Sequence, residues 1–366
     1  MEVKDLKWYS PFVFFAGAIL SFADPITDIL TLVEFYRADH KVWFGVGLTF
    51  VLLPCLAFPL AFHQLHISAP SLSPSNLART ALCTLHPFSA AFARLEAFLL
   101  SLKKCRSKDE TDLYFSVKAE GVLSYIDFAV LIEAVFECAP QFIIQLYAIS
   151  VQEEPVAIIQ IISLLISFLT LTWAFTATDK MSLVENNIIQ SSSYLNVKHQ
   201  LALYGTHLLL LSSRLFAICY FTVSYKWWVI GVLMVHCCVM VIATVIQNRD
   251  KVNCDASHVL FTLLFMGIHS LRDDFTNITI GADKNRAIRI GYFSHILFVL
   301  ENFFMILMSY FTYHPNAWYS LPVTVCVCVF SVLGSTMRIC LLRCLSKRPA
   351  EQPNSCDDSS NVNTCV

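Results

Sequence analysis

The stretch YIDFAVLIEAVFECAPQFIIQLYAI, residues 125–149, decides the fold of this chain. A helix needs roughly 20 apolar residues, each rising 1.5 Å, to cross the roughly 30 Å of hydrocarbon in a bilayer. This stretch is long enough, yet it holds Glu133, Glu137, Gln141 and Gln145 at a spacing of four. Residues four apart share one side of a helix, so the stretch predicts a membrane span with a polar stripe that faces protein or water.

The composition extends this prediction to the whole chain. Apolar residues make up 56% of the 366 residues and charged residues only 14%, whereas soluble proteins have about a quarter charged residues. Glycine is sparse and alternating strand patterns are absent, which favours helices over a barrel. We therefore expect an all-α polytopic membrane protein. Its eight predicted spans are 10–36, 41–66, 125–149, 156–178, 200–223, 226–247, 288–312 and 318–342.

Two further apolar segments are too short or too polar for full spans. Residues 80–102 contain Arg94 and Glu96, and residues 256–272 contain two histidines. We expect both segments to be half-inserted helices that return to the side from which they enter.

The resulting order of elements occurs twice along the chain. Two spans, a half-inserted helix and two spans make up a first membrane repeat at 1–180, and the same order makes up a second repeat at 199–345. Such parallel repeats place functional sites at their interface. Residues 346–366 are polar and are predicted to be a disordered cytoplasmic tail.

Charge patterning predicts the orientation of the chain. Of the 25 Lys and Arg residues, Arg37, Lys41 and Lys226 are those in connections on one side, and most of the others lie in the tails and opposite loops. The positive-inside rule then puts both termini in the cytoplasm. The sequence shows no nucleophile elbow, phosphate-cradling glycine loop or Cys-x-x-Cys pair. We expect no enzyme activity, cofactor, metal site or nucleic-acid partner.

Charged residues inside the predicted spans are the candidate functional residues. Asp24 and Asp28 lie one helical turn apart in the first span, where a charge at the bilayer centre costs about 2.5–3.5 kcal/mol. Alternatively, both lie near the outer interface. Arg214 and Asp24 each lie about 14 residues into their spans, and Glu137 lies about 12 residues into its own. Similar depth predicts an interior ionic cluster of Asp24, Glu137 and Arg214.

The polar stripe itself allows two interpretations. Its twelve residues from Glu133 to Gln145 cover about 18 Å, more than half of the hydrocarbon thickness, which favours the wall of a hydrophilic path. The alternative is structural hydrogen bonding between helices. Glu301, in the seventh span, occupies the position related by the repeat to Glu133 and Glu137, and a structural hydrogen bond is its other interpretation.

The predicted cytoplasmic segments hold weaker motifs. Residues 109–112, Asp-Glu-Thr-Asp, match the acidic pattern that caspases cut after, here at Asp112, although an acid-rich helix start is the favoured interpretation of these residues. Asp358 in the tail precedes a small residue and is a second candidate cleavage site. The cysteines suit packing as small apolar residues, but Cys340 and Cys344 lie beside the basic start of the tail, where palmitoylation is an alternative.

These residues together resemble the XK-related family, which includes apoptotic phospholipid scramblases. The resemblance rests on Asp24-Pro-Ile-Thr-Asp28, on Leu131 to Tyr147 with its Glu137-Cys-Ala-Pro-Gln141 centre, and on Ser213-Arg214-Leu. It implies eight spans with two half-inserted helices, at the plasma membrane. It also implies exchange of phospholipids between leaflets without energy input, which exposes phosphatidylserine during apoptosis.

Partners and regulation are likewise implied by the resemblance. Some relatives are switched on by caspases, and some pair with a single-span membrane protein. A homo-oligomer is the other assembly expected here. A disulfide-linked outer partner is not expected, because the predicted outer loops lack cysteine. Two other functions stay open, namely a solute or ion transporter that uses the same buried charges, and a non-transporting scaffold subunit.

Overall fold

The computed structural model describes residues 9–67, 88–106, 126, 130, 132–185, 195–247, 284–312 and 319–346. Within this part of the chain 93% of residues are helical and none forms a strand, so the all-α prediction is confirmed. The elements are α1 (Ser10–Arg37), α2 (Lys41–Ile67), α4 (Phe88–Arg106), the π-helix η2 (Ala134–Cys138), α6 (Ala139–Val151), α7 (Ile158–Glu185), α8 (Val197–Tyr225), α9 (Trp228–Gln247), α12 (Lys284–Thr312) and α13 (Ser320–Ser346).

Six of the described helical segments are long and apolar enough to cross a membrane. They are Ser10–Arg37, Ala134–Val151, Ile158–Lys180, Val197–Tyr225, Tyr292–Thr312 and Ser320–Leu345. A multi-pass helical membrane protein follows from these segments. A described helix also overlaps each of the eight predicted spans, and the count of eight stays a prediction.

The two predicted half-inserted segments differ in what the structure says of them. The first, residues 80–102, overlaps helix α4, which packs along α1. The second, residues 256–272, lies outside the described residues, as do all but the first residue of the predicted tail at 346–366. The division into two membrane repeats stays a prediction.

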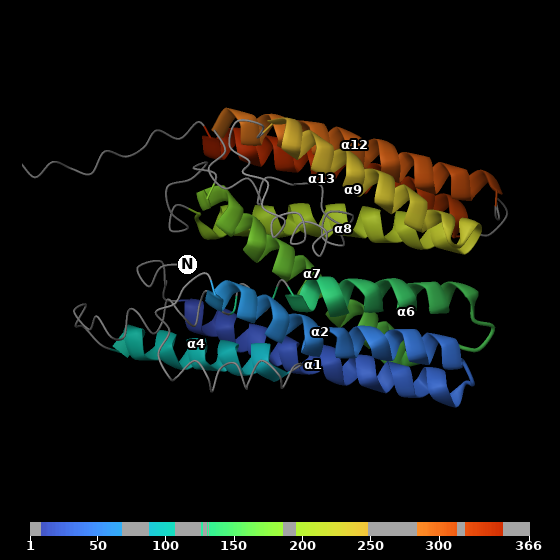
Figure 1. Cartoon of the computed structure of the whole chain (residues 1–366), viewed down its shortest axis with the longest axis horizontal. Coiled ribbons are helices and arrows are strands. Elements are labelled where there is room, and N and C mark those ends of the chain that lie inside the picture. The colour runs from blue at the N-terminus through green and yellow to red at the C-terminus, as the bar shows by residue number, and fades with distance from the viewer. Residues whose placement is uncertain are drawn as a thin grey trace, which may run out of the picture.

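The helices form two groups with one helix between them. In Figure 1, α1, α2, α4 and α6 lie in the lower group, and α8, α9, α12 and α13 lie in the upper group. Helix α7 crosses from one group to the other and contacts α1, α6 and α8. Because α7 has neighbours on both sides, its side chains are in position to link the two groups.

The connections α1–α2, α6–α7 and α8–α9 lie at one end of the bundle, on the right in Figure 1. Two of them are held together, because His40 in the α1–α2 turn lies 3.3 Å from Glu154 in the α6–α7 loop. Helix α1 begins and α13 ends at the opposite end. The start of α1 and the end of α13 therefore lie at the same end of the helical bundle.

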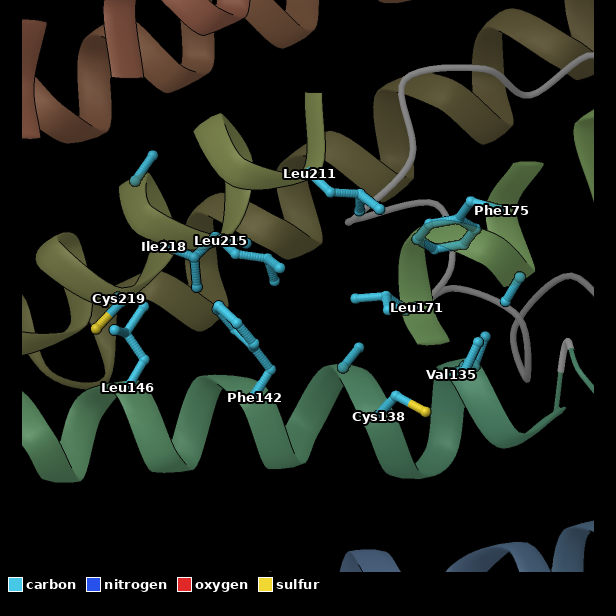
Figure 2. Close-up of a cluster of buried hydrophobic side chains, with 14 of the residues drawn as sticks. Val135, Cys138, Phe142, Leu146, Leu171, Phe175, Leu211, Leu215, Ile218 and Cys219 are labelled. Atoms are coloured by element: carbon cyan, nitrogen blue, oxygen red, sulfur yellow. The ribbon is translucent and has the colours of Figure 1, made fainter. Parts of the chain in front are cut away.

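The apolar core runs along one face of η2 and α6. Figure 2 shows side chains from that face, such as Phe142 and Leu146, meeting Leu171 of α7 and Leu215 and Ile218 of α8. Lipid is as apolar as these side chains, so burial from water does not drive their association in a membrane. Close van der Waals packing holds these helices together instead.

Helix α13 approaches α8 closely at a glycine. A methyl group added at Gly334 would lie 2.9 Å from Cγ of Leu210 and 3.2 Å from Cβ of Leu209. Small residues permit such an approach between membrane helices. Gly231 of α9 provides a comparison, because an added methyl group there would meet no heavy atom within 4 Å.

We predict that Gly334→Ala destabilises the protein by about 1–3 kcal/mol, because the added methyl group overpacks the α8–α13 contact. The matched control Gly231→Ala should be neutral or stabilising, since alanine favours helix over glycine by about 1 kcal/mol. Thermal unfolding of both variants in detergent measures the difference. Equal effects of the two substitutions would contradict the close approach.

Candidate functional site

Asp24 and Asp28 lie on α1 one turn apart, and both side chains are fully buried. Between them stands Pro25, which has no N–H to donate to the carbonyl of Ser21 and so loosens the helix locally. Thr27 donates its hydroxyl to the backbone carbonyls of Ala23 and Asp24 in the same turn. Both are enclosed by neighbouring helices, and the alternative that they lie near the outer interface of the membrane stays open.

The donors to these two carboxylates come from other helices. Asp24 accepts hydrogen bonds from Ser167 at 2.7 Å and from the Cys138 thiol at 3.0 Å. Asp28 accepts bonds from Ser163 at 2.5 Å and from the Gln145 amide at 3.0 Å. Since Ser163 and Ser167 lie on α7, the two carboxylates join α1 to α7 and to η2–α6.

The polar stripe of residues 133–145 owes its alignment to the π-helix. At 3.6 residues per turn, a spacing of four over-rotates by about 40° at each step, so a regular helix would spread the stripe around its axis. The wider turn at Ala134–Cys138 reverses part of that drift. Its cause lies in the sequence, because Pro140 cannot donate to the carbonyl of Phe136 and disfavours a regular α-turn there.

The stripe residues are all buried and contact three elements. Gln141 donates to the backbone carbonyl of Gly47 on α2 at 2.8 Å. Gln145 donates to Ser163 on α7 as well as to Asp28. Glu137 lies among the carboxylates of the site, with Asp24, Asp28 and Glu133 as electrostatic neighbours. The predicted stripe is therefore turned into the protein.

Arg94 supplies a cation to this side of the bundle. Its guanidinium is buried, lies 3.9 Å from a carboxylate oxygen of Glu133, and donates to the backbone carbonyl of Gly17 at 3.1 Å. Sequence reasoning treated Arg94 as a polar interruption of a half-inserted helix and missed this contact. The sequence could have indicated this pairing, because a buried arginine requires an acidic partner and the polar stripe contains two glutamates.

These residues form what we call the acidic group, which consists of Asp24, Asp28, Glu133, Glu137 and Arg94. Even without Glu137, three carboxylates face one guanidinium in the described part of the chain. There, Oδ2 of Asp28 and both carboxylate oxygens of Glu133 also accept no hydrogen bond. The group therefore has more carboxyl groups than guanidinium groups, and more acceptors than its own donors satisfy.

Arg214 has different partners from those expected. Its guanidinium donates to Glu301 and to Asn302 of α12, each at 3.0 Å, and lies 5.4 Å from the ring centroid of Phe298. His236 of α9 lies 2.8 Å from the same Glu301 oxygen. These residues are named the arginine group. The predicted ion pair of Arg214 with Asp24 and Glu137 is wrong, because α8 presents Arg214 to α12, in the upper group of helices.

A third buried group links α7 to the upper group of helices. Asp179 of α7 forms a short contact with Arg338 of α13, and its other oxygen lies 3.0 Å from Nε2 of His207 on α8. All three side chains are buried. Sequence reasoning missed this group because Asp179 lies one residue beyond the predicted span 156–178. The unassigned Arg338 inside a span was the signal that could have found it.

The remaining predicted sites lie elsewhere. The two candidate caspase sites, Asp112 and Asp358, are outside the described residues. Of the eight predicted cluster residues, the structure brings Asp24, Asp28, Glu133, Glu137, Gln141 and Gln145 together on one side, and Arg214 and Glu301 on the other.

Comparison with known proteins adds one finding. Residues 12–346 match the family described as XK-related protein. The match covers almost the whole described part of the chain, including all three buried groups. No curated individual protein matches the chain.

We predict that Arg214 and Glu301 are energetically coupled. A double-mutant cycle of Arg214→Ala and Glu301→Ala, read by unfolding in detergent, should give a coupling free energy of about 1 kcal/mol, which is typical of polar contacts between membrane helices. Arg214→Ala combined with Asp24→Ala serves as control and should be additive to within about 0.5 kcal/mol. Coupling of Arg214 with Asp24, together with additive effects of Arg214 and Glu301, would instead support the single ionic cluster predicted from depth.

Proposed function

The chain belongs to the XK-related family, and on that premise we propose that it is a phospholipid scramblase of the plasma membrane. In this proposal lipids move between leaflets in both directions without energy input, and phosphatidylserine becomes exposed, as in apoptosis. No covalent bond is made or broken, so the protein is not an enzyme. The lipid headgroup travels along polar protein groups while its acyl chains stay in the bilayer.

The surplus of acceptors in the acidic group is the observation that carries this proposal. A contact that only held helices together would balance its charges, as Asp179 does with Arg338 and Glu301 does with Arg214. Instead, buried oxygens of Asp28 and Glu133 accept no hydrogen bond within the described residues. Buried acceptors of this kind call for an explanation, and a cationic choline or amine of a headgroup fits them.

The phosphate of the headgroup needs positive partners near the same route. Arg94 lies at the acidic group, and Arg214 lies beyond the apolar core of α6 and α8. An arginine fork binds phosphate through paired hydrogen bonds, which a lysine cannot do in the same way. We propose Arg94 as the first phosphate contact, because it shares its site with Glu133.

The described structure corresponds to a closed state in this proposal. The acidic residues are enclosed, and their donors come from α6 and α7 while the aspartates belong to α1. A separation of α1 from α7 would expose Asp24 and Asp28 together. Such an opening would line about 18 Å of depth, from Glu133 to Gln145, with polar side chains.

The finer architecture and the regulation belong to the same proposal. It has eight full spans, two half-inserted helices and both termini in the cytoplasm. A single-span membrane partner or a second copy of this chain would stabilise the assembly. Cleavage by a caspase after Asp112 or Asp358 would supply the stimulus that opens α1 from α7.

We predict that the purified protein in liposomes lets a membrane-impermeant reductant bleach fluorescent lipid from both leaflets, not the outer leaflet alone. Glu137→Gln should slow this exchange about tenfold, equivalent to about 1.4 kcal/mol in the barrier, because a carboxylate facing the headgroup is lost. The matched control is Glu154→Gln in the exposed α6–α7 loop, which should keep the original rate.

Stability separates a lipid route from structural bonding. Glu137→Gln keeps the side-chain shape and removes an ionisable group beside three other carboxyl groups, so unfolding in detergent should be unchanged or shifted to higher temperature. If Glu137→Gln slows lipid exchange only in proportion to a loss of stability, the proposal that Glu137 lines a lipid route is contradicted. Cation flux without lipid exchange would indicate a transporter, and neither activity in sealed vesicles would indicate a scaffold subunit.

We predict that an executioner caspase cuts the intact protein after Asp112 or Asp358, and that the cut raises the rate of lipid exchange. Mass spectrometry of the fragments locates the cut, and Asp112→Asn and Asp358→Asn identify the site that matters. A chain that stays intact after prolonged incubation would rule out proteolysis as the stimulus. It would not bear on the lipid exchange itself, which the liposome measurement tests.

A further inference from the structure

Two cysteines continue the lipid-facing surface of the last helix. Exposed side chains follow one another along α13 at helical spacing, through Val325, Val329 and Val332. Near the end of the helix, Cys340 and Cys344 are also exposed and lie one turn apart. Residues four apart share a side of a helix, so the two thiols point the same way.

The surroundings of the two thiols are typical of a membrane–water interface. Arg343, between them in the sequence, donates to the hydroxyl of Tyr292 on α12 at 2.9 Å, and its guanidinium lies 5.5 Å from the centroid of that ring. Tyrosine and arginine both prefer the level where apolar chains meet polar headgroups. The thiols therefore lie where a chain attached to sulfur could enter the bilayer directly.

Basic residues lie next to the two thiols in the sequence. Arg343 is adjacent to Cys344 and three residues from Cys340, and Lys347 and Arg348 follow in the sequence. Acyl transfer to sulfur needs an accessible thiol, and Cys340 and Cys344 are both exposed. By contrast, Cys138 and Cys219 are buried, and Cys326 is exposed near the other end of α13, about 21 Å away along the helix.

We propose that Cys340 and Cys344 are S-acylated with long-chain fatty acids donated by acyl-coenzyme A. The cysteine sulfur attacks the thioester carbonyl, a new carbon–sulfur bond forms to the protein, and the bond to coenzyme A breaks. Coenzyme A leaves with the proton of the cysteine thiol, so nothing is oxidised or reduced. A membrane-bound acyltransferase on the cytoplasmic side catalyses the transfer.

The modification would fix the end of the last helix in the membrane. Two acyl chains lying along the exposed face of α13 would hold residue 346, and with it the start of the basic tail, at the inner surface. Two attached chains hold a segment at the membrane far more firmly than one chain does. This role is independent of the proposed lipid transport.

The test is an acyl-exchange measurement on the full chain expressed in cultured animal cells. Free thiols are blocked, hydroxylamine cleaves thioesters, and a polyethylene-glycol maleimide adds a fixed mass to each released thiol. We expect two hydroxylamine-dependent additions for the natural chain, one for Cys340→Ser or Cys344→Ser, and none for the double variant. Cys326→Ser, on the exposed face near the other end of the same helix, should keep two.

Absence of any hydroxylamine-dependent addition in the natural chain would overturn the proposal, as would additions that persist in the double variant. Mass spectrometry of the α13 peptide from the natural chain gives the same answer even if the double variant fails to fold. The side of the membrane on which the thiols lie is determined with a membrane-impermeant maleimide. It is applied to hydroxylamine-treated cells that are either intact or permeabilised. Labelling without permeabilisation would contradict the cytoplasmic transfer.

Discussion

The structure depends on one constraint, which is that a charged side chain inside the bundle needs a partner from another helix. In water an isolated carboxylate or guanidinium is solvated, but in hydrocarbon it is costly. Each buried charge therefore selects its helical neighbours. Arg214 brings α8 to α12, Arg94 brings α4 towards the stripe, and Asp179 brings α7 to α13. The arrangement of the helices follows the arrangement of these contacts.

The same constraint explains why one helix has two opposed faces. On η2 and α6, apolar side chains meet α7 and α8, while the polar stripe meets α1, α2 and a different part of α7. Polar contacts between membrane helices contribute only about 0.6–2 kcal/mol each, so they do not hold the bundle by themselves. Tight packing at positions such as Gly334 contributes the remainder, and the polar contacts fix which faces meet.

The sequence was sufficient to predict the helices and the stripe, because both depend on local spacing. The predicted spans 10–36 and 41–66 end within a residue of α1 and α2, and the residues spaced by four from Glu133 to Gln145 do share a buried side. The partner of Arg214 could not be predicted in this way. Counting residues fixes the depth of a side chain but leaves open its direction around the bundle. Nor does spacing reveal the π-helix, which depends on how Pro140 is accommodated in three dimensions.

Helix α7 contacts two of the three buried groups, and these two differ in whether each carboxyl group has a cationic partner. Ser163 and Ser167 of this helix hold the aspartates of the acidic group, and Asp179, twelve residues or about 18 Å further on, holds Arg338. A helix moves nearly as a rigid rod over that length. On the proposed function, a movement of α7 that frees Asp24 and Asp28 must also strain its contact with α13. The balanced group would therefore oppose opening, and the acceptors of the acidic group would be satisfied by a lipid headgroup only after that contact gives way.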